Sequence, residues 1–271
     1  MKIKYEIASK TDIKSFLRFN HYSLEVIHNL FQDSELIKVN NHKISYPFLI
    51  KTGDVLEITL PREISNQICE NEPIDIVYED DYIIIVNKPM NLASIATSAH
   101  YHHNLGSRVL NYFKNNNIYS KVHFINRLDK ETQGLVLIAK HQYIHNLFAK
   151  TTKIVKKYRC FVKNKPAKEN DFINLPIGKM EGNIKRFIDF ENGKYSLTEY
   201  SIANYDGEKY LLDITLHTGR THQIRLHLAS IGCPLIGDPL YNENIDGEFY
   251  LQSYYLEFIH PITKENLIIT I

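Results

Sequence analysis

The stretch Asn126-Arg127-Leu128-Asp129-Lys130-Glu131-Thr132-Gln133-Gly134 runs directly into the apolar segment Leu135-Val136-Leu137-Ile138-Ala139. A continuous apolar run of this length predicts a central strand that is buried on both faces, and the glycine before it marks a loop. The loop presents the Asp129 carboxylate two residues after the Arg127 guanidinium, and in an extended loop two such side chains lean to the same side of the backbone. We therefore expect function to depend on Asp129.

Hydrophobic periodicity predicts further elements on both sides of this segment. Before it we expect strands at 74–78 and 82–86 and a helix at 105–113. After it we expect helices near 141–151 and 221–230 and strands near 158–162, 197–205, 210–216, 250–251 and 267–271. Strands outnumber helices without strict alternation, so the sequence predicts the α+β class.

The N-terminal segment shows a different pattern. Residues 12–31 predict two short helices that break near Asn20-His21, with Asp12 and Ser23 as candidate N-caps. Residues 36–39, 43–46 and 53–58 predict a hairpin and a closing strand. A polar, proline-bracketed segment at 61–73 is typical of a linker. We therefore expect two domains, at 1–66 and 72–271.

Positive charge is concentrated locally, although the formal net charge of the 271 residues is only +1. The segment from Lys150 to Lys168 holds several cations and no acid. Phosphate binding depends on such local clustering and not on the total charge. This segment is therefore a candidate surface for docking RNA.

The placement of the cysteines and the length of the apolar runs indicate in which cellular compartment the protein is expected. Cys69, Cys160 and Cys233 lie far apart without a Cys-x-x-Cys pair, which argues against a disulfide framework or a zinc site and favours a reducing cytoplasm. No apolar run approaches the roughly 20 residues that span a bilayer, so we expect no membrane partner.

Several motifs in order resemble the RluA family of RNA pseudouridine synthases. They are the segments 78–81 through 87–89, 127–129, 156–158 and 218–225, followed by 231–238. The resemblance covers residues 72 to 271 and implies a mixed, mainly antiparallel sheet with flanking helices. It also implies isomerisation of uridines in ribosomal or transfer RNA to pseudouridine, without a metal or other cofactor. We expect a monomer.

The resemblance assigns three catalytic residues. Asp129 is the nucleophile or the base on a flipped-out uridine, and the sequence leaves both paths open. Arg225 is its partner, and a nearby guanidinium is expected to depress the pKa of Asp129. Tyr158 is the tyrosine whose ring stacks on the uracil, although position alone would favour a packing role for one of 18 tyrosines.

A second group of residues is expected to bind the substrate. Its members lie in the matching motifs and are Arg127, Lys156, Arg220, His222, Gln223, Ile224 and Leu226. Arg127 either fills the gap that the flipped nucleotide leaves or contacts a phosphate. Arg220, His222 and Gln223 open the predicted helix at Thr221, where its positive end favours phosphate or base edges. Ile224 and Leu226 are expected to line the slot or pack the core.

Some positions depart from the family pattern. Asn126 stands where the family usually has histidine, and Gln133 where it usually has serine.

The order of elements in the N-terminal segment resembles the small S4 RNA-binding module. The resemblance is to a degenerate form of that module, since Arg18 is the only arginine in its two predicted helices. This S4-like module either binds RNA or serves as a packing or spacer module.

Two rival functions remain. An RNA-binding or ribosome-assembly protein with weak or no catalysis would keep the same fold. A carboxylate-pair hydrolase is disfavoured because we expect no second acid in the motif loops. The histidines at 100, 102, 103, 141 and 145 do not match a metal motif, and we expect them to face solvent.

Overall fold

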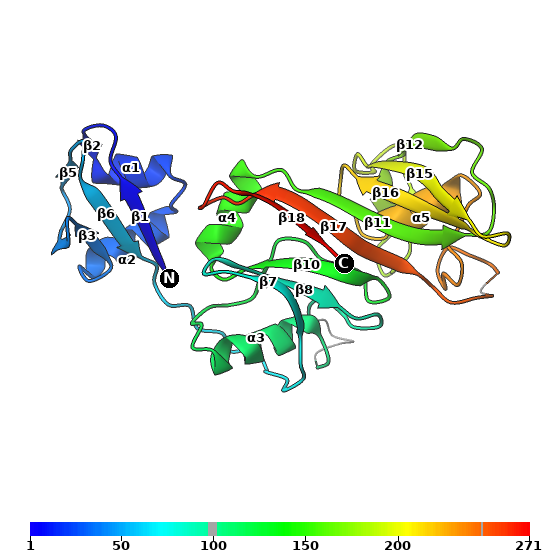
Figure 1. Cartoon of the computed structure of the whole chain (residues 1–271), viewed down its shortest axis with the longest axis horizontal. Helices are drawn as coiled ribbons and strands as arrows, with labels where there is room; N and C mark the ends of the chain where they lie inside the picture. The colour runs from blue at the N-terminus through cyan, green and yellow to red at the C-terminus, as the bar shows by residue number, and fades with distance from the viewer. Residues whose placement is uncertain (97–101, 245) are drawn as a thin grey trace.

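The computed structural model of the protein describes residues 1–96, 102–244 and 246–271. The N-terminal elements gather at one end of the molecule (Figure 1) and form a small sheet in the order β1-β6-β3-β4, beside a short β2–β5 pair. Their bounds are β1 Lys2–Glu6, β2 Thr11–Asp12, α1 Ile13–Phe19, α2 Leu24–Gln32, β3 Ile37–Val39, β4 His42–Lys43, β5 Leu49–Ile50 and β6 Val55–Thr59.

Both predicted N-caps are confirmed. The Asp12 side chain accepts a hydrogen bond from the Ser15 N–H (2.9 Å), and Ser23 Oγ accepts one from the Val26 N–H (3.2 Å). Each bond satisfies one of the backbone donors that the first turn of a helix leaves free. We call residues 1–60 the N-terminal module; its likeness to S4 stays a prediction.

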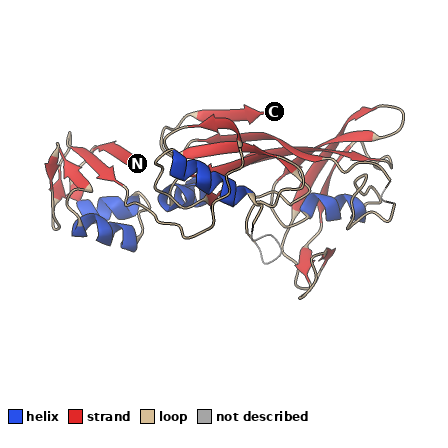
Figure 2. Cartoon of the chain, turned by 90° about the horizontal axis from the view of Figure 1, so that it is seen from below, coloured by secondary structure: helices blue, strands red, loops and turns tan. Residues whose placement is uncertain are grey.

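A larger sheet follows, and in the described residues it has ten strands, eight of them in the order β12-β15-β16-β11-β17-β10-β8-β7. The strand bounds are β7 Asp75–Glu79, β8 Ile83–Lys88, β9 His123–Phe124, β10 Gln133–Ala139, β11 Val155–Val162, β12 Asn170–Asn174, β15 Leu197–Tyr205, β16 Tyr210–Leu216, β17 Leu251–Ile259 and β18 Asn266–Thr270. The helices are α3 Leu105–Asn115, α4 Gln142–Thr151 and α5 Gln223–Ser230, and a separate hairpin joins β13 Ile177–Lys179 to β14 Arg186–Ile188. Figure 2 shows helices on the same side of the small and the large sheet.

The predicted class is confirmed. The strands β10 and β17 run parallel, whereas β8–β10, β11–β16, β11–β17 and β15–β16 pair antiparallel. The apolar run 135–139 is a central strand, β10, and its residues are completely buried, as are residues 83–86 of the neighbouring β8. Such strands are buried on both faces, which explains why their sequences are apolar without alternation.

The helix α4 fills the space where β10 and β17 separate. These two strands pair over only two positions, Gln133 with Gln252 and Gly134 with Ser253. Beyond them, Phe148 of α4 packs edge-on against Phe258 of β17, with ring centroids 5.3 Å apart. The element that follows the functional loop is thus fixed by packing at its far end.

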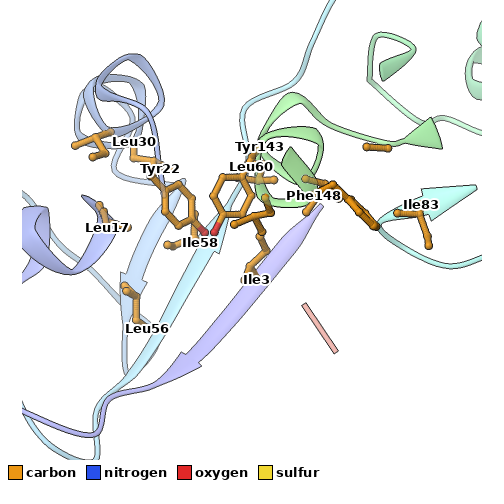
Figure 3. Close-up of a cluster of buried hydrophobic side chains, with 14 of the residues drawn as sticks. Ile3, Leu17, Tyr22, Leu30, Leu56, Ile58, Leu60, Ile83, Tyr143 and Phe148 are labelled. Carbon is orange, nitrogen blue, oxygen red and sulfur yellow. The ribbon is translucent and has the colours of Figure 1, made fainter. Parts of the chain in front are cut away.

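The N-terminal module packs against α4 through three tyrosines, and Figure 3 labels two of them, Tyr22 and Tyr143. The rings of Tyr22 and Tyr143 stack with centroids 4.0 Å apart. The Tyr5 hydroxyl lies 3.1 Å from that of Tyr22 and 3.0 Å from that of Tyr143. These rings belong to one hydrophobic cluster that contains Leu17 of the module and Phe148 of α4.

Glu63 adds a polar clamp at the same junction. Its carboxylate lies 2.6 Å from His123 Nε2 and accepts hydrogen bonds from the backbone N–H groups of Lys121 and Gln142. His141 Nε2 lies 3.9 Å from the Glu63 carboxylate.

Within the described residues, no helix combines the length and apolar character that crossing a membrane requires.

Candidate active site

The Asp129 loop is tied down on both sides of the carboxylate. Ser94 Oγ donates to the Leu128 carbonyl (2.6 Å) and accepts from the Leu128 N–H (3.1 Å). The Thr132 N–H donates to the Asp129 carbonyl (3.2 Å), which closes a tight turn. The ammonium of Lys88 donates to the Lys130 carbonyl (3.1 Å). The backbone around Asp129 is therefore fixed by the surrounding protein.

Asn126 extends this anchoring to the central strand. Its side-chain amide donates to the Leu135 carbonyl (3.1 Å), and its Oδ1 accepts from the Leu137 N–H (2.7 Å). Both bonds use the neutral amide as donor and acceptor at once, which a histidine ring in one tautomer does with different geometry. The departure at 126 is thus accommodated by bonds within the protein.

A row of paired residues crosses the sheet beneath the Asp129 loop. Lys88 pairs with Gly134, Gly134 with Ser253, and Ser253 with Tyr158. Paired residues of neighbouring strands point to the same face. Two small residues therefore lie between the large side chains of Lys88 and Tyr158, and the Asp129 carboxylate is close enough to both to act on their charge.

Arg225, on α5, is completely buried among three carboxylates. Its Nε and Nη2 donate to Asp238 Oδ2 (2.8 Å) and Oδ1 (2.7 Å), so that this pair is bidentate. Its Nη1 lies 3.2 Å from Glu131 Oε2 and 4.0 Å from Asp129 Oδ2. The expected neighbourhood of Arg225 and Asp129 is present, but Asp238 is the main partner of the guanidinium.

The charge state of Asp129 differs from the expectation. Burial raises the pKa of Asp129 above its ordinary value, and the negative charge of Glu131 raises it further. The charges of His222, Arg225 and Lys88 oppose this effect without cancelling it. The prediction of a depressed pKa was wrong because Arg225 already neutralises two other acids and the partial burial of the carboxylate disfavours its charged form.

Tyr158 belongs to the same row of paired residues, next to Ser253. Its side chain is only 5% exposed. Burial raises the pKa of its phenol, the Ser253 hydroxyl lowers it, and the charge of Asp129 raises it again. The phenol is therefore neutral at ordinary pH and near enough to Asp129 for their charges to interact.

Lys88 supplies a buried cation behind the loop. Its ammonium donates to the carbonyl oxygens of Pro89, Leu92 and Lys130. Burial lowers the pKa of Lys88 to about 8, against the opposing charges of Asp129 and Glu131. Lys88 therefore both anchors the loop and acts on the charge of Asp129.

The helix α5 begins at Gln223, two residues later than expected. Its N-cap His222 has φ +56° and no side-chain capping bond. His222 Nδ1 lies 3.1 Å from the Tyr241 hydroxyl. Burial lowers the pKa of His222, whereas the charge of Asp129 raises it. His222 therefore faces Asp129 from the start of the helix.

Gln223 is committed to the protein itself. Its Oε1 accepts from Thr218 Oγ1 (2.9 Å) and the Arg220 N–H (3.0 Å), and its Nε2 donates to the Leu197 carbonyl (3.1 Å) and to Thr198 Oγ1 (3.0 Å). The side chain is 2% exposed. It shapes the loop before α5, and its polar groups are already engaged within the protein.

The other expected binding residues occupy different places. Arg127 is exposed on the Asp129 loop, and Arg220 donates to the Tyr195 carbonyl (3.3 Å). Ile224 and Leu226 are buried. The Lys156 ammonium lies near Gly219, where an added Cβ would be 3.6 Å away, so Lys156 adjoins the loop before α5.

The basic segment 150–168 does not form one surface. Neighbouring residues of a strand point to opposite faces, and β11 divides the cations accordingly. Lys156 shares its face with Tyr158, whereas Lys157 lies over the Tyr255 ring (4.8 Å) and Arg159 pairs with Asp213 (2.9 Å). The expectation of a single docking surface was wrong because clustering in sequence is not clustering in space on a strand.

The histidines also depart in part from the expectation. His141 is buried as the N-cap of α4, where its Nδ1 accepts from the Tyr143 N–H (3.0 Å). It was expected to face solvent. His100 lies outside the described residues. Among the residues that are described, no group of three or more His, Cys, Asp or Glu is arranged to hold a metal ion.

The missed acids are Glu131 and Asp238. Glu131 stands two residues after Asp129 in the quoted loop, so the view that the motif loops lack a second acid was wrong. Asp238 ends the matching segment 231–238, and only the fold shows that it meets Arg225. The site thus combines a half-buried carboxylate of raised pKa, a neutral phenol and a buried guanidinium.

The chain is similar in sequence to known RNA pseudouridine synthases. A family model described as RNA pseudouridylate synthase matches residues 82–230. RNA pseudouridine synthase YhcT of Bacillus subtilis (strain 168) is 32% identical over 242 residues, which cover 86% of this chain and 80% of that protein. Ribosomal large subunit pseudouridine synthase D of Buchnera aphidicola subsp. Schizaphis graminum is 33% identical over 239 residues, 80% of this chain and 72% of that one.

A solved structure shows the same fold. Human RNA Pseudouridylate Synthase Domain Containing 1 superposes with a TM-score of 0.60 at 22% identity, and the match covers 74% of this chain and 84% of that one.

Proposed function

Because the chain belongs to the RluA family of RNA pseudouridine synthases, we propose that Asp129 isomerises a flipped-out uridine of ribosomal or transfer RNA. The observation that carries this proposal is the Asp129 carboxylate, which lies 4.0 Å from Arg225 Nη1 and close enough to Tyr158 and Lys88 to act on their charge. The three free cysteines fit a reducing cytoplasm.

The reaction sets three requirements. The bond from ribose C1′ to N1 must break, the uracil must turn while it is held, and C5 must join C1′. This needs a carboxylate near the sugar, a slot that retains the loose base, and a group that helps to move the C5 proton. Nothing is oxidised or added, so no redox partner is needed.

Asp129 meets the first requirement by either of two paths. As a nucleophile its oxygen bonds to C1′ while N1 leaves with the bonding electrons; as a base it removes the C2′ proton while N1 leaves. A raised pKa makes the carboxylate a stronger base than a free aspartate in both cases.

The remaining roles follow from position. The Tyr158 ring stacks on the uracil, and its neutral phenol handles the C5 proton. Arg127, exposed on the Asp129 loop, fills the gap in the RNA or contacts a phosphate. Lys156 and His222 contact the substrate, Arg220 contacts a phosphate nearby, and Gln223, Ile224 and Leu226 hold the wall of the slot.

The N-terminal module belongs to a proposed first domain at 1–66, which precedes a catalytic domain at 72–271. Its packing on α4 through Tyr22 and Tyr143 supports a spacer or packing role. Whether the module also binds RNA is tested by deleting the charge of Arg18, its only helical arginine.

The test of the main proposal is Asp129→Asn. We expect unchanged RNA binding and no pseudouridine, measured by tritium release from RNA that carries 5-tritiated uridine. The matched control is Asp81→Asn, which removes one exposed acid from the turn between β7 and β8 and should keep full activity. Release by Asp129→Asn would remove Asp129 from the mechanism. Wild-type protein that binds RNA without any release would favour the non-catalytic rival.

A further inference from the structure

Glu131 occupies the position on Arg225 that Asp129 would otherwise take. Asp238 fills Nε and Nη2 of the guanidinium at 2.8 and 2.7 Å. The remaining nitrogen, Nη1, is 3.2 Å from Glu131 but 4.0 Å from Asp129. Glu131 therefore forms the hydrogen bond, and Asp129 stays just outside hydrogen-bond distance.

The local charges make this competition consequential. Three carboxylates, Asp129, Glu131 and Asp238, surround one guanidinium. The other charged or titratable groups that act on Asp129 are Lys88 from β8, His222 from the start of α5 and Tyr158 from β11. An aspartate that pairs directly with a guanidinium ordinarily has a pKa depressed by about 1–3 units, because the pair stabilises its ionised form.

A directly paired carboxylate would be a poorer reagent. Its basicity would fall with its pKa, and the lone pairs on the paired oxygen would point at Arg225 instead of at the sugar. The Glu131 side chain is 30% exposed and that of Asp129 is 26% exposed. Both carboxylates are thus partly open to solvent, whereas Arg225 is completely buried.

We propose that Glu131 is a positioning residue that holds Asp129 off the Arg225 guanidinium and so keeps the catalytic carboxylate basic and directed at the substrate. The proposal rests on the assignment of Asp129 as nucleophile or base. It assigns Glu131 no contact with the reacting atoms. Its effect is exerted through the charge and the position of Asp129.

The test compares Glu131→Gln with the wild type. Loss of the negative charge should let Asp129 approach Nη1, so the pKa of Asp129 should fall by about one unit. The acid limb of the single-turnover pH profile should move to lower pH by the same amount, and the plateau rate should fall about two- to fivefold as the base weakens. The dissociation constant for RNA should stay within about twofold, because Asp129 and not RNA affinity is affected.

Two further variants separate charge from structure. Glu131→Asp keeps the charge and should keep the wild-type acid limb. Glu6→Gln removes one exposed acid from β1 and should change nothing. If Glu131→Gln loses activity with an unmoved acid limb, or loses RNA affinity in proportion, then Glu131 is a structural or RNA-contacting residue and the proposal is wrong.

A readout without turnover keeps the two proposals distinguishable. The pKa of Asp129 is measured in the free protein by ¹³C NMR of labelled aspartate carboxyls, with Asp129→Asn used to assign the signal. A lower pKa in Glu131→Gln supports the positioning role even where no turnover is seen. An unchanged pKa overturns it even in an active enzyme.

Discussion

Tyr158 is the residue whose surroundings constrain its chemistry most closely. It lies in the row Gly134–Ser253–Tyr158–Ile214–Tyr200, with two small residues on one side of it. Its phenol is buried and neutral, with a pKa above the ordinary value because of burial. The Tyr158 ring can stack on a base, and its neutral hydroxyl can exchange a proton with that base.

Tyr158→Phe should therefore separate binding from turnover. The ring remains, so the RNA dissociation constant should be unchanged, while single-turnover release of tritium should slow by at least about a hundredfold, the usual contribution of a proton-transfer group. Tyr200→Phe is the matched control, because Tyr200 is an equally buried tyrosine two strands away in the same row. Equal rates for Tyr158→Phe and wild type would show that the phenol has no part in the reaction.

At the scale of elements, Gly134 sets how closely two strands approach. Its φ of +112° is unfavourable for other residues, and a Cβ at this position would lie 2.2 Å from the Ser253 carbonyl oxygen. The parallel contact of β10 with β17 spans only two residue pairs. A side chain at Gly134 would therefore push apart β17 and β10, the strand that follows the Asp129 loop.

Gly134→Ala should destabilise the protein by more than about 3 kcal/mol, since backbone strain and a backbone clash add. Gly207→Ala is the control, because Gly207 has φ +101° with no atom within 4 Å of the added Cβ. It should cost only about 1–2 kcal/mol, the strain of a positive φ alone. Both free energies of unfolding come from urea titration. Equal losses would mean that the clash with Ser253 relaxes at no cost.

Elements with a strong local pattern could be predicted from the sequence. The apolar run 135–139, the capped helices of residues 12–31 and the strands near 197–205 and 210–216 all form where expected. The short strands β9, β13 and β14 carry two or three residues each and give too little periodicity to detect. The full length of β17 was also missed, because a bulge near Ser253 interrupts its alternation.

The candidate site could be predicted residue by residue but not in its charge balance. The motifs pointed to Asp129, Tyr158 and Arg225, and the fold brings these three together. The sequence did not show that Asp238 takes two nitrogens of Arg225 or that Glu131 takes the third. Burial and pairing are properties of space, so the raised pKa of Asp129 followed only from the structure.

At the scale of the whole molecule, Glu63 holds the segment that follows the N-terminal module against the catalytic half. Burial raises its pKa, but the His123 hydrogen bond and the charges of His141 and His123 lower it more strongly, to about 2. A carboxylate with a lowered pKa stabilises the folded state above its ordinary pKa of 4.5. This contribution to the free energy of unfolding is lost as the pH falls toward 2, because the Glu63 carboxylate of the folded protein is then protonated.

Glu63→Gln should therefore lower the free energy of unfolding by on the order of 3 kcal/mol above about pH 5, and the difference should vanish toward pH 2. Glu35→Gln is the control, because Glu35 pairs with Lys38 on the exposed surface. Its loss should be at most about 1 kcal/mol. A difference for Glu63→Gln that does not vary with pH would exclude the ionised clamp.

The stacked rings of Tyr22 and Tyr143 have a practical consequence for optical work. The chain contains 18 tyrosines and no tryptophan, so its near-ultraviolet emission arises from tyrosine alone. One ring of the pair belongs to each side of the junction. Undocking of the N-terminal module would separate the Tyr22 and Tyr143 rings. The tyrosine fluorescence of the unlabelled protein would then report whether the module is docked.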